Sequence, residues 1–204
     1  MIELLACKLG RNDETPNIEL AEKLCVSMDE NGVREIADGL KSGDKAVVND
    51  CIKVLYEIGS RRPALIADFA DGFITALSSR NNRLVWGSMR ALSFVAPIKA
   101  DAIFKRLPEI IAAYESGSVI TVDNGVSVFA QLCKASKDYE ERIFPLLLNH
   151  LANCQAKQIP QHAERIAVCV NSSNKEAFIK AVETSIDELS ESQKSRVLKL
   201  IKRL

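Results

Sequence analysis

Two histidines and a cysteine are the residues whose types and spacing come nearest to a metal site. His150 lies four residues before Cys154, which places both side chains on one face of a helix. The pair supplies only two ligands, and no Cys or His follows at a second ligand-pair spacing. His162 and Cys169, seven residues apart, would have to swing in from further along the chain. We therefore expect structural or solvent-exposed roles for these side chains, with no metal ion and no cofactor.

The chain also lacks the sequence patterns of common catalytic and nucleotide-binding sites. Its nine glycines fall mostly at turns or helix ends and form no phosphate-cradling loop. Nucleophile-elbow and zinc-protease patterns are missing as well. The sequence therefore predicts a protein that is not an enzyme.

Charge and hydropathy limit the partners. The 27 basic and 27 acidic residues cancel, so the general electrostatic footprint of a nucleic-acid or membrane-surface protein is missing. No apolar stretch approaches the length of a membrane span, and the N-terminus lacks the basic region that begins a signal peptide. We expect a cytoplasmic protein that binds no membrane and for which nucleic acid is a disfavoured partner.

The cysteines support a reducing compartment. They are scattered along helical stripes and form no CxxC pair, which is typical of small buried hydrophobic residues rather than of a disulfide framework. Reduced structural roles are expected for all six: Cys7, Cys25, Cys51, Cys133, Cys154 and Cys169.

The elements that must position any site repeat every 37 residues. Each period carries an apolar quartet with the spacing of one helix stripe. The quartets begin at residues 48, 85, 122 and 159, and they are Val48, Ile52, Leu55, Ile58; Val85, Met89, Leu92, Val95; Val122, Val126, Phe129, Leu132; and Ile159, Ala163, Ile166, Cys169. Such a repeat is typical of stacked units that bury their apolar faces against their neighbours.

Turns and preceding helices keep the same register. One turn segment in each period contains Ser, Asn, Asp or Gly residues, which suit helix stops and N-caps. These segments are 42–44, 79–81, 116–118 and 153–155. Apolar pairs precede them in each period: Ile36 and Leu40, Phe73 and Leu77, Ile110 and Tyr114, Leu147 and Leu151. Each turn should therefore join an outer helix to an inner one. The segment from Val119 to Val122 is β-prone but leads into a helical stripe, so an all-α fold is expected.

The predicted fold is a right-handed α-solenoid of about five stacked antiparallel helix pairs, forming a single domain over residues 1–204. An N-terminal helical cap over 1–28 precedes repeats near 31–60, 63–97, 101–136, 139–171 and 174–204. The last pair breaks the period and should bury its stripes against the fourth repeat: Phe178, Val182, Ile186, Val197, Leu198 and Ile201.

The repeat resembles the HEAT and armadillo superfamily. HEAT outer helices often carry a kinking proline, and Pro108 and Pro145 lie one period apart in two successive outer helices. The chain departs from the HEAT pattern in three ways. The first two outer helices lack this proline, and Asp44 is the only aspartate at its turn position. The basic residue that HEAT repeats tend to carry on the inner helix is present only as Lys53 and Arg90. HEAT-like and armadillo-like assignments stay equally open. The resemblance implies a curved scaffold whose inner helices bind another protein or peptide.

One flank of the inner helices is the candidate binding surface. Trp86 and Arg90 lie beside the buried stripe of the second inner helix. Steps of 37 residues extend this flank, and we predict partner contacts at Asn49, Lys53, Trp86, Arg90, Asp123, Ser127 and Glu164, with Pro160 beside the last. Trp86 would be the central anchor of a stripe that changes sign along its length. An ordinary solvated flank is the alternative. The sequence reveals neither the partner's identity nor the oligomeric state.

Two further hypotheses use basic residues. Trp86, Arg83, Arg90 and Asp123 are the nearest match to the DNA-binding surface of HEAT-like alkylpurine DNA glycosylases, although neutral charge and 5% aromatic content disfavour a DNA-reading groove. The C-terminal helix carries a basic series that either caps the stack or docks an acidic partner: Lys194, Arg196, Lys199, Lys202 and Arg203.

Overall fold

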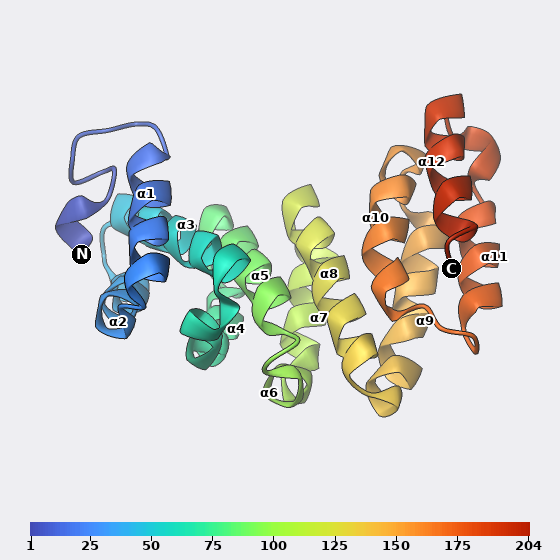
Figure 1. The fold of residues 1–204 in the computed structure, drawn as a ribbon, viewed down its shortest axis with the longest axis horizontal. Coiled ribbons are helices and arrows are strands. Elements are labelled where there is room, and N and C mark those ends of the chain that lie inside the picture. Colours follow the sequence, from blue (N-terminus) through green and yellow to red (C-terminus); the bar gives the residue numbers. More distant parts are fainter. The chain divides into compact units, whose positions relative to one another are not determined.

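The computed structural model describes residues 1–204 and contains only helices and connecting turns. The all-α prediction is confirmed, because helical apolar spacing runs through the whole chain and favours no strand. The β-prone segment at Val119 begins a helix, α8 (Val119–Ala135). The chain divides into two compact units, Met1–Gly125 and Val126–Leu204. Figure 1 shows the helices in chain order. The expectation of a single continuous domain stays a prediction.

The first unit is built around α3 (Lys45–Arg61), which packs against α1 (Thr15–Ser27) on one side and α5 (Asn82–Val95) on the other. Asn17 of α1 is fully buried and accepts a hydrogen bond from the Ala6 amide at 3.0 Å, which ties the N-terminal segment to this helix. The remaining helices of the unit are η1 (Ile2–Leu4), α2 (Glu30–Asp38), η2 (Gly39–Lys41), η3 (Pro63–Phe69), α4 (Ala70–Ala76), α6 (Ala100–Lys105), α7 (Leu107–Ser116) and the first part of α8.

The second unit contains the rest of α8 and two packed helix pairs. α9 (Lys137–Asn153) packs against α10 (Ile159–Ile166) and α11 (Lys175–Glu183), and α10 packs against α12 (Glu191–Ile201). Short 3-10 helices connect them: η4 (Ala156–Gln158), η5 (Ala167–Cys169) and η6 (Ile186–Glu188). No helix in either unit is long and apolar enough to cross a membrane.

The repeated turns act as helix starts in three of the four periods. Asp44 accepts a hydrogen bond from the Ala46 amide at 2.9 Å, and Asn81 accepts one from the Arg83 amide at 3.2 Å. The Ser118 hydroxyl accepts one from the Thr121 amide at 3.4 Å. Each side chain satisfies an amide that has no partner within its helix. The fourth turn has no such cap, and η4 follows it instead.

The apolar quartets form the core as predicted. Fifteen of the sixteen stripe residues are buried, and only Val122 of the third quartet is partly exposed. α3 and α5 approach closely because residue 87 is glycine. A β-carbon at Gly87 would lie 2.6 Å from Cγ1 of Ile52, so no larger residue fits at this crossing without displacing the buried isoleucine.

Two details differ from the sequence-based expectation. Pro108 does not kink a continuous helix; it is the second residue of α7, which follows a break after α6. Proline has no amide hydrogen and its ring clashes with the carbonyl four residues earlier, so a separate helix starts there. Pro145, by contrast, lies inside α9. Leu198 is 46% exposed rather than buried, because the buried residue of α12 is its neighbour Val197 and adjacent helical positions point about 100° apart.

Candidate functional site

Four side chains from α3 and α5 gather on the predicted flank of the first unit, and we call them the Tyr56 cluster: Lys53, Tyr56, Trp86 and Arg90. The Tyr56 ring is buried, and the Arg90 guanidinium carbon lies 4.6 Å from its centroid. The Lys53 Nζ lies 5.0 Å from the same centroid. The Trp86 ring packs against Tyr56 with centroids 5.6 Å apart and a tilt of 44°. Both cations are held at distances typical of cation–π contacts.

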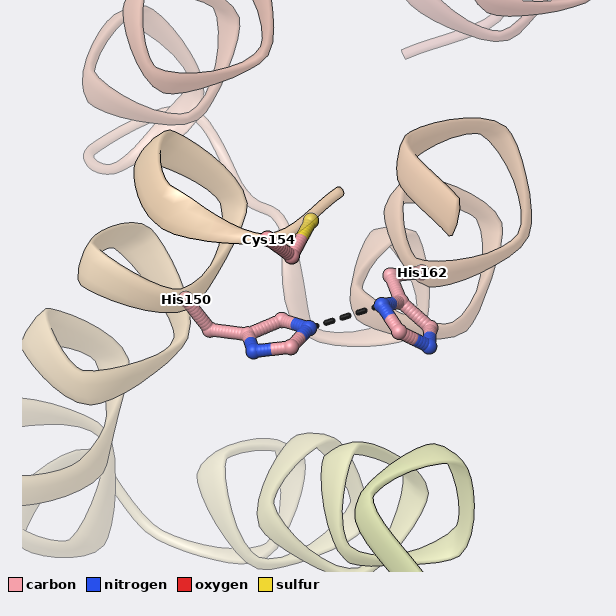
Figure 2. Close-up of side chains that lie close together, drawn as sticks. All are labelled: His150, Cys154 and His162. Atoms are coloured by element: carbon pink, nitrogen blue, oxygen red, sulfur yellow. Dashed lines mark hydrogen bonds between the residues drawn. The ribbon is translucent and has the colours of Figure 1, made fainter. Parts of the chain in front are cut away.

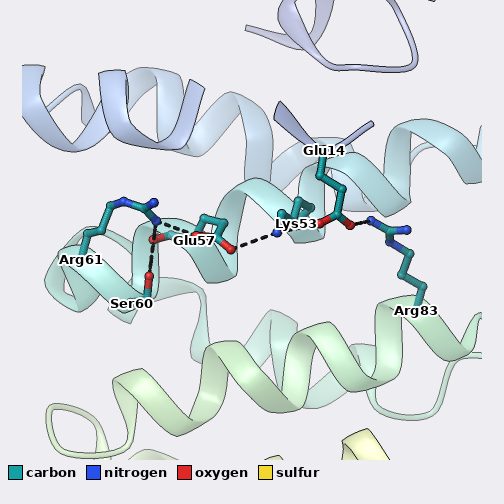
Figure 3. A network of polar contacts seen from close by, with 6 residues as sticks. All are labelled: Glu14, Lys53, Glu57, Ser60, Arg61 and Arg83. Atoms are coloured by element: carbon teal, nitrogen blue, oxygen red, sulfur yellow. Dashed lines mark hydrogen bonds and ion pairs between the residues drawn. The ribbon is translucent and has the colours of Figure 1, made fainter. Parts of the chain in front are cut away.

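A chain of ion pairs lies beside the cluster (Figure 3). Lys53 is 6% exposed, and its Nζ lies 2.8 Å from Glu14 Oε2 and 3.0 Å from Glu57 Oε1. Glu14 also pairs with Arg83, and Glu57 pairs with Arg61 at 2.6 Å. Two carboxylates therefore neutralise the buried ammonium group, which a buried charge requires.

These pairs shift the pKa values of the carboxyls. Burial acts to raise the pKa of Glu14, but hydrogen bonds and charges from Lys53 and Arg83 outweigh it, and the pKa is lowered overall. Burial likewise acts to raise the pKa of Glu57, but Arg61 and Lys53 outweigh it, and the pKa is lowered overall. Both carboxylates are therefore stabilised in their charged form.

The cluster leaves one cation and one aromatic ring for contact with another molecule. Arg90 is partly exposed and has no carboxylate partner in the structure, because its guanidinium rests on the Tyr56 ring. Trp86 is also partly exposed. Arg83, by contrast, is paired with Glu14, and its Nε is buried without a hydrogen-bond partner. The arrangement is suited to holding a carboxylate beside an apolar group.

The other predicted contact residues have structural partners. In the first unit Asn49 accepts a hydrogen bond from Asn81 at 2.8 Å, and Asp123 is partly buried on α8. In the second unit, Ser127 accepts a hydrogen bond at 2.8 Å. Its donor is Arg165 of α10.

Glu164, the last predicted contact residue, is joined to the basic C-terminal helix. It forms a two-pronged pair with Arg196 of α12, at 2.6 and 2.5 Å. This contact connects the predicted flank, which ends at Glu164, to the basic C-terminal helix. A continuous binding stripe from Lys53 to Glu164 stays a prediction.

The second unit brings His162 to the predicted pair of His150 and Cys154, a contact that the sequence did not predict. His150 Nε2 lies 2.7 Å from His162 Nδ1. One ring nitrogen from each histidine and the Cys154 sulfur all lie within 4.8 Å of one another (Figure 2). Cys169 does not join them. Its thiol donates a hydrogen bond to the Ile166 carbonyl at 3.1 Å, and its proximity to Cys133 together with burial raises the pKa of the Cys133 thiol.

Sequence reasoning missed Tyr56, Glu14 and Glu57. The spacing of Lys53 and Glu57, one helical turn apart, was an available signal for an ion pair. No comparable signal pointed to Glu14, which precedes α1 and reaches α3 only through tertiary packing.

Comparison with solved structures identifies the fold. A designed armadillo repeat protein is similar over 99% of both chains, with a TM-score of 0.69 and 11% sequence identity. Its stacked helical repeats correspond to those of this chain. The fold is an armadillo/HEAT-like helical repeat.

Other engineered proteins share this repeat fold. One covers 99% of this chain and 96% of its own length, with a TM-score of 0.65 and 18% identity. A designed armadillo repeat protein in complex with the peptide (KR)4 covers 92% of this chain and 91% of its own, with a TM-score of 0.64 and 11% identity. No protein-family model and no curated protein sequence matches this chain. At these identities the likeness shows the helical repeat fold alone.

Proposed function

We propose that this chain is a non-enzymatic protein-interaction scaffold that binds an extended or helical segment of another protein along its inner helices. Two solved structures with the same repeat fold support a partner of this kind. One is a designed armadillo repeat protein in complex with a peptide, and another was designed for modular peptide recognition. The packed helices of a repeat fold offer many side chains to one elongated partner without chemistry on that partner.

The observation that carries the proposal is that a partly exposed aromatic ring, Trp86, lies beside a partly exposed cation without a carboxylate partner, Arg90. Arg90 is fixed over Tyr56 and has no carboxylate of its own, while Trp86 lies against the same ring. Tryptophan and arginine are the side chains most often found at the centre of protein interfaces. We propose that the bound segment presents an acidic side chain next to an apolar one. Lys53 would help to position this surface and would not bind the acidic side chain itself, because its charge is already neutralised by Glu14 and Glu57.

Peptide-library selection tests this preference. A display library would be panned on the wild-type protein and on Arg90→Glu. The wild type should enrich sequences with Asp or Glu beside an apolar residue, and the charge reversal should shift the enrichment toward Lys and Arg. Arg80→Glu is the matched control, because Arg80 is exposed, lies outside the cluster and undergoes the same change of charge. It should keep the wild-type preference.

A second measurement places the bound peptide. Trp86 is the only tryptophan in the chain, so a change in its fluorescence on titration reports contact near the cluster directly. The Arg90→Glu change should weaken an acidic peptide at least about tenfold, which is about 1.4 kcal/mol. Enrichment of the same sequences by both proteins, or binding without a Trp86 signal, would move the site elsewhere. Steeply salt-dependent binding of duplex DNA that Arg90→Glu abolishes would support the nucleic-acid alternative.

We also propose a cytoplasmic location. The support is chemical: all six cysteines are free thiols, and four of them are buried among apolar side chains. Reducing compartments maintain thiols in this state. Imaging of the tagged protein in its native cell, with fractionation as a second measurement, would test this location.

A further inference from the structure

His150, Cys154 and His162 converge between two helices of the second unit. His150 lies in the last turn of α9, and Cys154 directly follows that helix, with its amide bonded to the His150 carbonyl at 2.8 Å. The chain then turns through η4 and enters α10, where His162 is fully buried. In Figure 2 the His150 ring and the Cys154 thiol come from one helix end, and the His162 ring approaches from the other helix.

The separations are close to those of a tetrahedral metal site. Zn–N bonds of about 2.0–2.1 Å place two nitrogen ligands about 3.3 Å apart, and a Zn–S bond of about 2.3 Å places sulfur about 3.6 Å from each nitrogen. The two nitrogens here are 2.7 Å apart, so they would separate by about 0.6 Å. No pair among the three atoms exceeds 4.8 Å, so the sulfur would approach by at most about 1.2 Å.

The donor atoms determine which ion fits. Two imidazole nitrogens and one thiolate sulfur suit Zn²⁺ and similar borderline ions, whereas Mg²⁺ and Ca²⁺ require oxygen ligands. Three protein ligands leave a fourth tetrahedral position for water or an added ligand. A hydrogen-bonded histidine pair without metal would account for the 2.7 Å contact. The Cys154 thiol also donates a hydrogen bond to the Leu151 carbonyl at 3.9 Å, which the metal-bound thiolate would give up.

We propose that His150 Nε2, His162 Nδ1 and Cys154 Sγ bind one Zn²⁺ ion that joins the end of α9 to α10. Each ligating nitrogen must offer a lone pair, so the ring whose N–H now lies between the histidines shifts that proton to its other nitrogen. The Cys154 thiol gives its proton to solvent and binds as thiolate. Binding therefore releases about one proton per ion, and the loaded site carries a net charge of +1, from the two positive charges of the metal and the one negative charge of the thiolate.

The ordinary chemistry of cysteine gives this proton balance, because a thiol with a pKa of about 8.5 is protonated at neutral pH in the absence of metal. Zinc must displace that proton, so affinity should fall as the pH is lowered. Bound metal would also stabilise the fold, because the unfolded chain does not hold the three ligands together.

Cobalt titration tests the ligand set directly. The full-length protein would be stripped with chelator and titrated with Co²⁺. We expect one ion per chain, visible bands of the intensity typical of tetrahedral cobalt, and a thiolate-to-cobalt charge-transfer band in the near ultraviolet. Zinc should displace cobalt and remove these bands. Calorimetric titration with Zn²⁺ in two buffers of different ionisation enthalpy should report about one released proton.

Matched cysteine variants distinguish a specific zinc site from incidental metal binding. Cys154→Ser should abolish the charge-transfer band, weaken zinc at least about tenfold, and remove the rise in melting temperature that zinc gives the wild type. Cys7→Ser, which changes another partly exposed cysteine in the first unit, should leave all three measurements unchanged. His150→Gln is a second ligand variant at a partly exposed position, and circular dichroism would verify that each variant is folded.

Three results would overturn the proposal. The first is absence of tetrahedral cobalt bands in the wild type, which would leave a hydrogen-bonded histidine pair only. The second is a charge-transfer band that survives Cys154→Ser. The third is zinc affinity that is unchanged in a folded His150→Gln protein. None of these outcomes depends on partner binding at the Tyr56 cluster.

Discussion

Lys53 shows how a single residue takes on a different role once its neighbours are known. Sequence periodicity placed it on a binding flank, and the structure gives it a position on that flank but 6% exposure and two carboxylate partners. A long side chain can bury its stem and charge where acids are supplied to pair with it. Its contribution to binding would be to hold Tyr56 and Glu14 in place.

The first prediction concerns Glu14 at neutral pH. Glu14→Gln would leave the buried Lys53 with Glu57 as its one carboxylate. Exposed pairs contribute under about 1 kcal/mol, whereas breaking a fully buried pair costs about 3–5 kcal/mol. Glu14 is 44% exposed and Lys53 is buried, so we expect an intermediate loss of about 1–2 kcal/mol in the free energy of unfolding. Urea denaturation would measure it, and an unchanged midpoint would contradict the pairing.

The second prediction is the pH dependence of the same pair. The pKa of Glu14 is lower in the folded protein than its ordinary value of 4.5, so the folded state binds fewer protons at this group. The stabilisation is therefore present above the ordinary value and is lost as the pH falls through the lowered pKa. The stability difference between wild type and Glu14→Gln should shrink as the pH falls from about 6 to about 3. A constant difference over this range would be inconsistent with a lowered pKa.

At the scale of helices, the crossing of α3 and α5 positions the Tyr56 cluster. Tyr56 and Trp86 come from these two helices, and their rings meet because the backbones approach closely at Gly87. The 37-residue period predicted the buried stripe of each helix. It could not predict the distance between the helices, which depends on how Ile52 fits against a position with no side chain.

The third prediction tests that crossing. Gly87→Ala would place a β-carbon 2.6 Å from a buried Ile52 atom and should destabilise the protein by about 1–3 kcal/mol. Gly72→Ala in α4 is the matched control. Nothing lies within 4 Å of its added carbon, so reduced backbone freedom in the unfolded chain should stabilise the protein by about 0.5–1 kcal/mol. Thermal unfolding followed by circular dichroism would measure both, and equal shifts of the same sign would contradict this account.

The fourth prediction concerns the terminal helices. Phe178 of α11 is fully buried, and α11 packs against α9. Phe178→Ala should cost about 3–5 kcal/mol through lost burial and a residual cavity. Leu198→Ala removes apolar atoms from a 46% exposed residue of α12 and should change stability by no more than about 0.5 kcal/mol. Chemical denaturation of the two variants would separate them; a larger loss at Leu198 would show that α12 buries a face different from the one the structure shows.

For the whole molecule, the fifth prediction is the state of the thiols. Protein purified without reductant and then unfolded should titrate six free thiols. In the folded protein, reaction with a thiol reagent should be slow even at the partly exposed Cys7, because burial and a hydrogen bond to Asp50 raise its pKa to about 11. A reproducible count below six in unaggregated protein would show that a disulfide forms.

The sequence by itself determined the helical class, the period and the buried stripes of the four inner helices. These depend on the spacing of apolar residues within a helix, as in the quartet from Val85 to Val95, and this spacing can be read directly from the sequence. It also placed Trp86 and Arg90 on one flank, because residues four apart share a helix face.

Only the tertiary structure decided which side chains from different helices meet. Glu14 reaches Lys53, and His162 rather than Cys169 reaches His150, although no spacing in the sequence distinguishes these outcomes. The physical reason is that such contacts depend on the crossing and separation of helices, which small residues, breaks and helix starts set together. The flank that carries Trp86 and Arg90 was therefore visible in the sequence, and the convergence of two histidines with Cys154 was not.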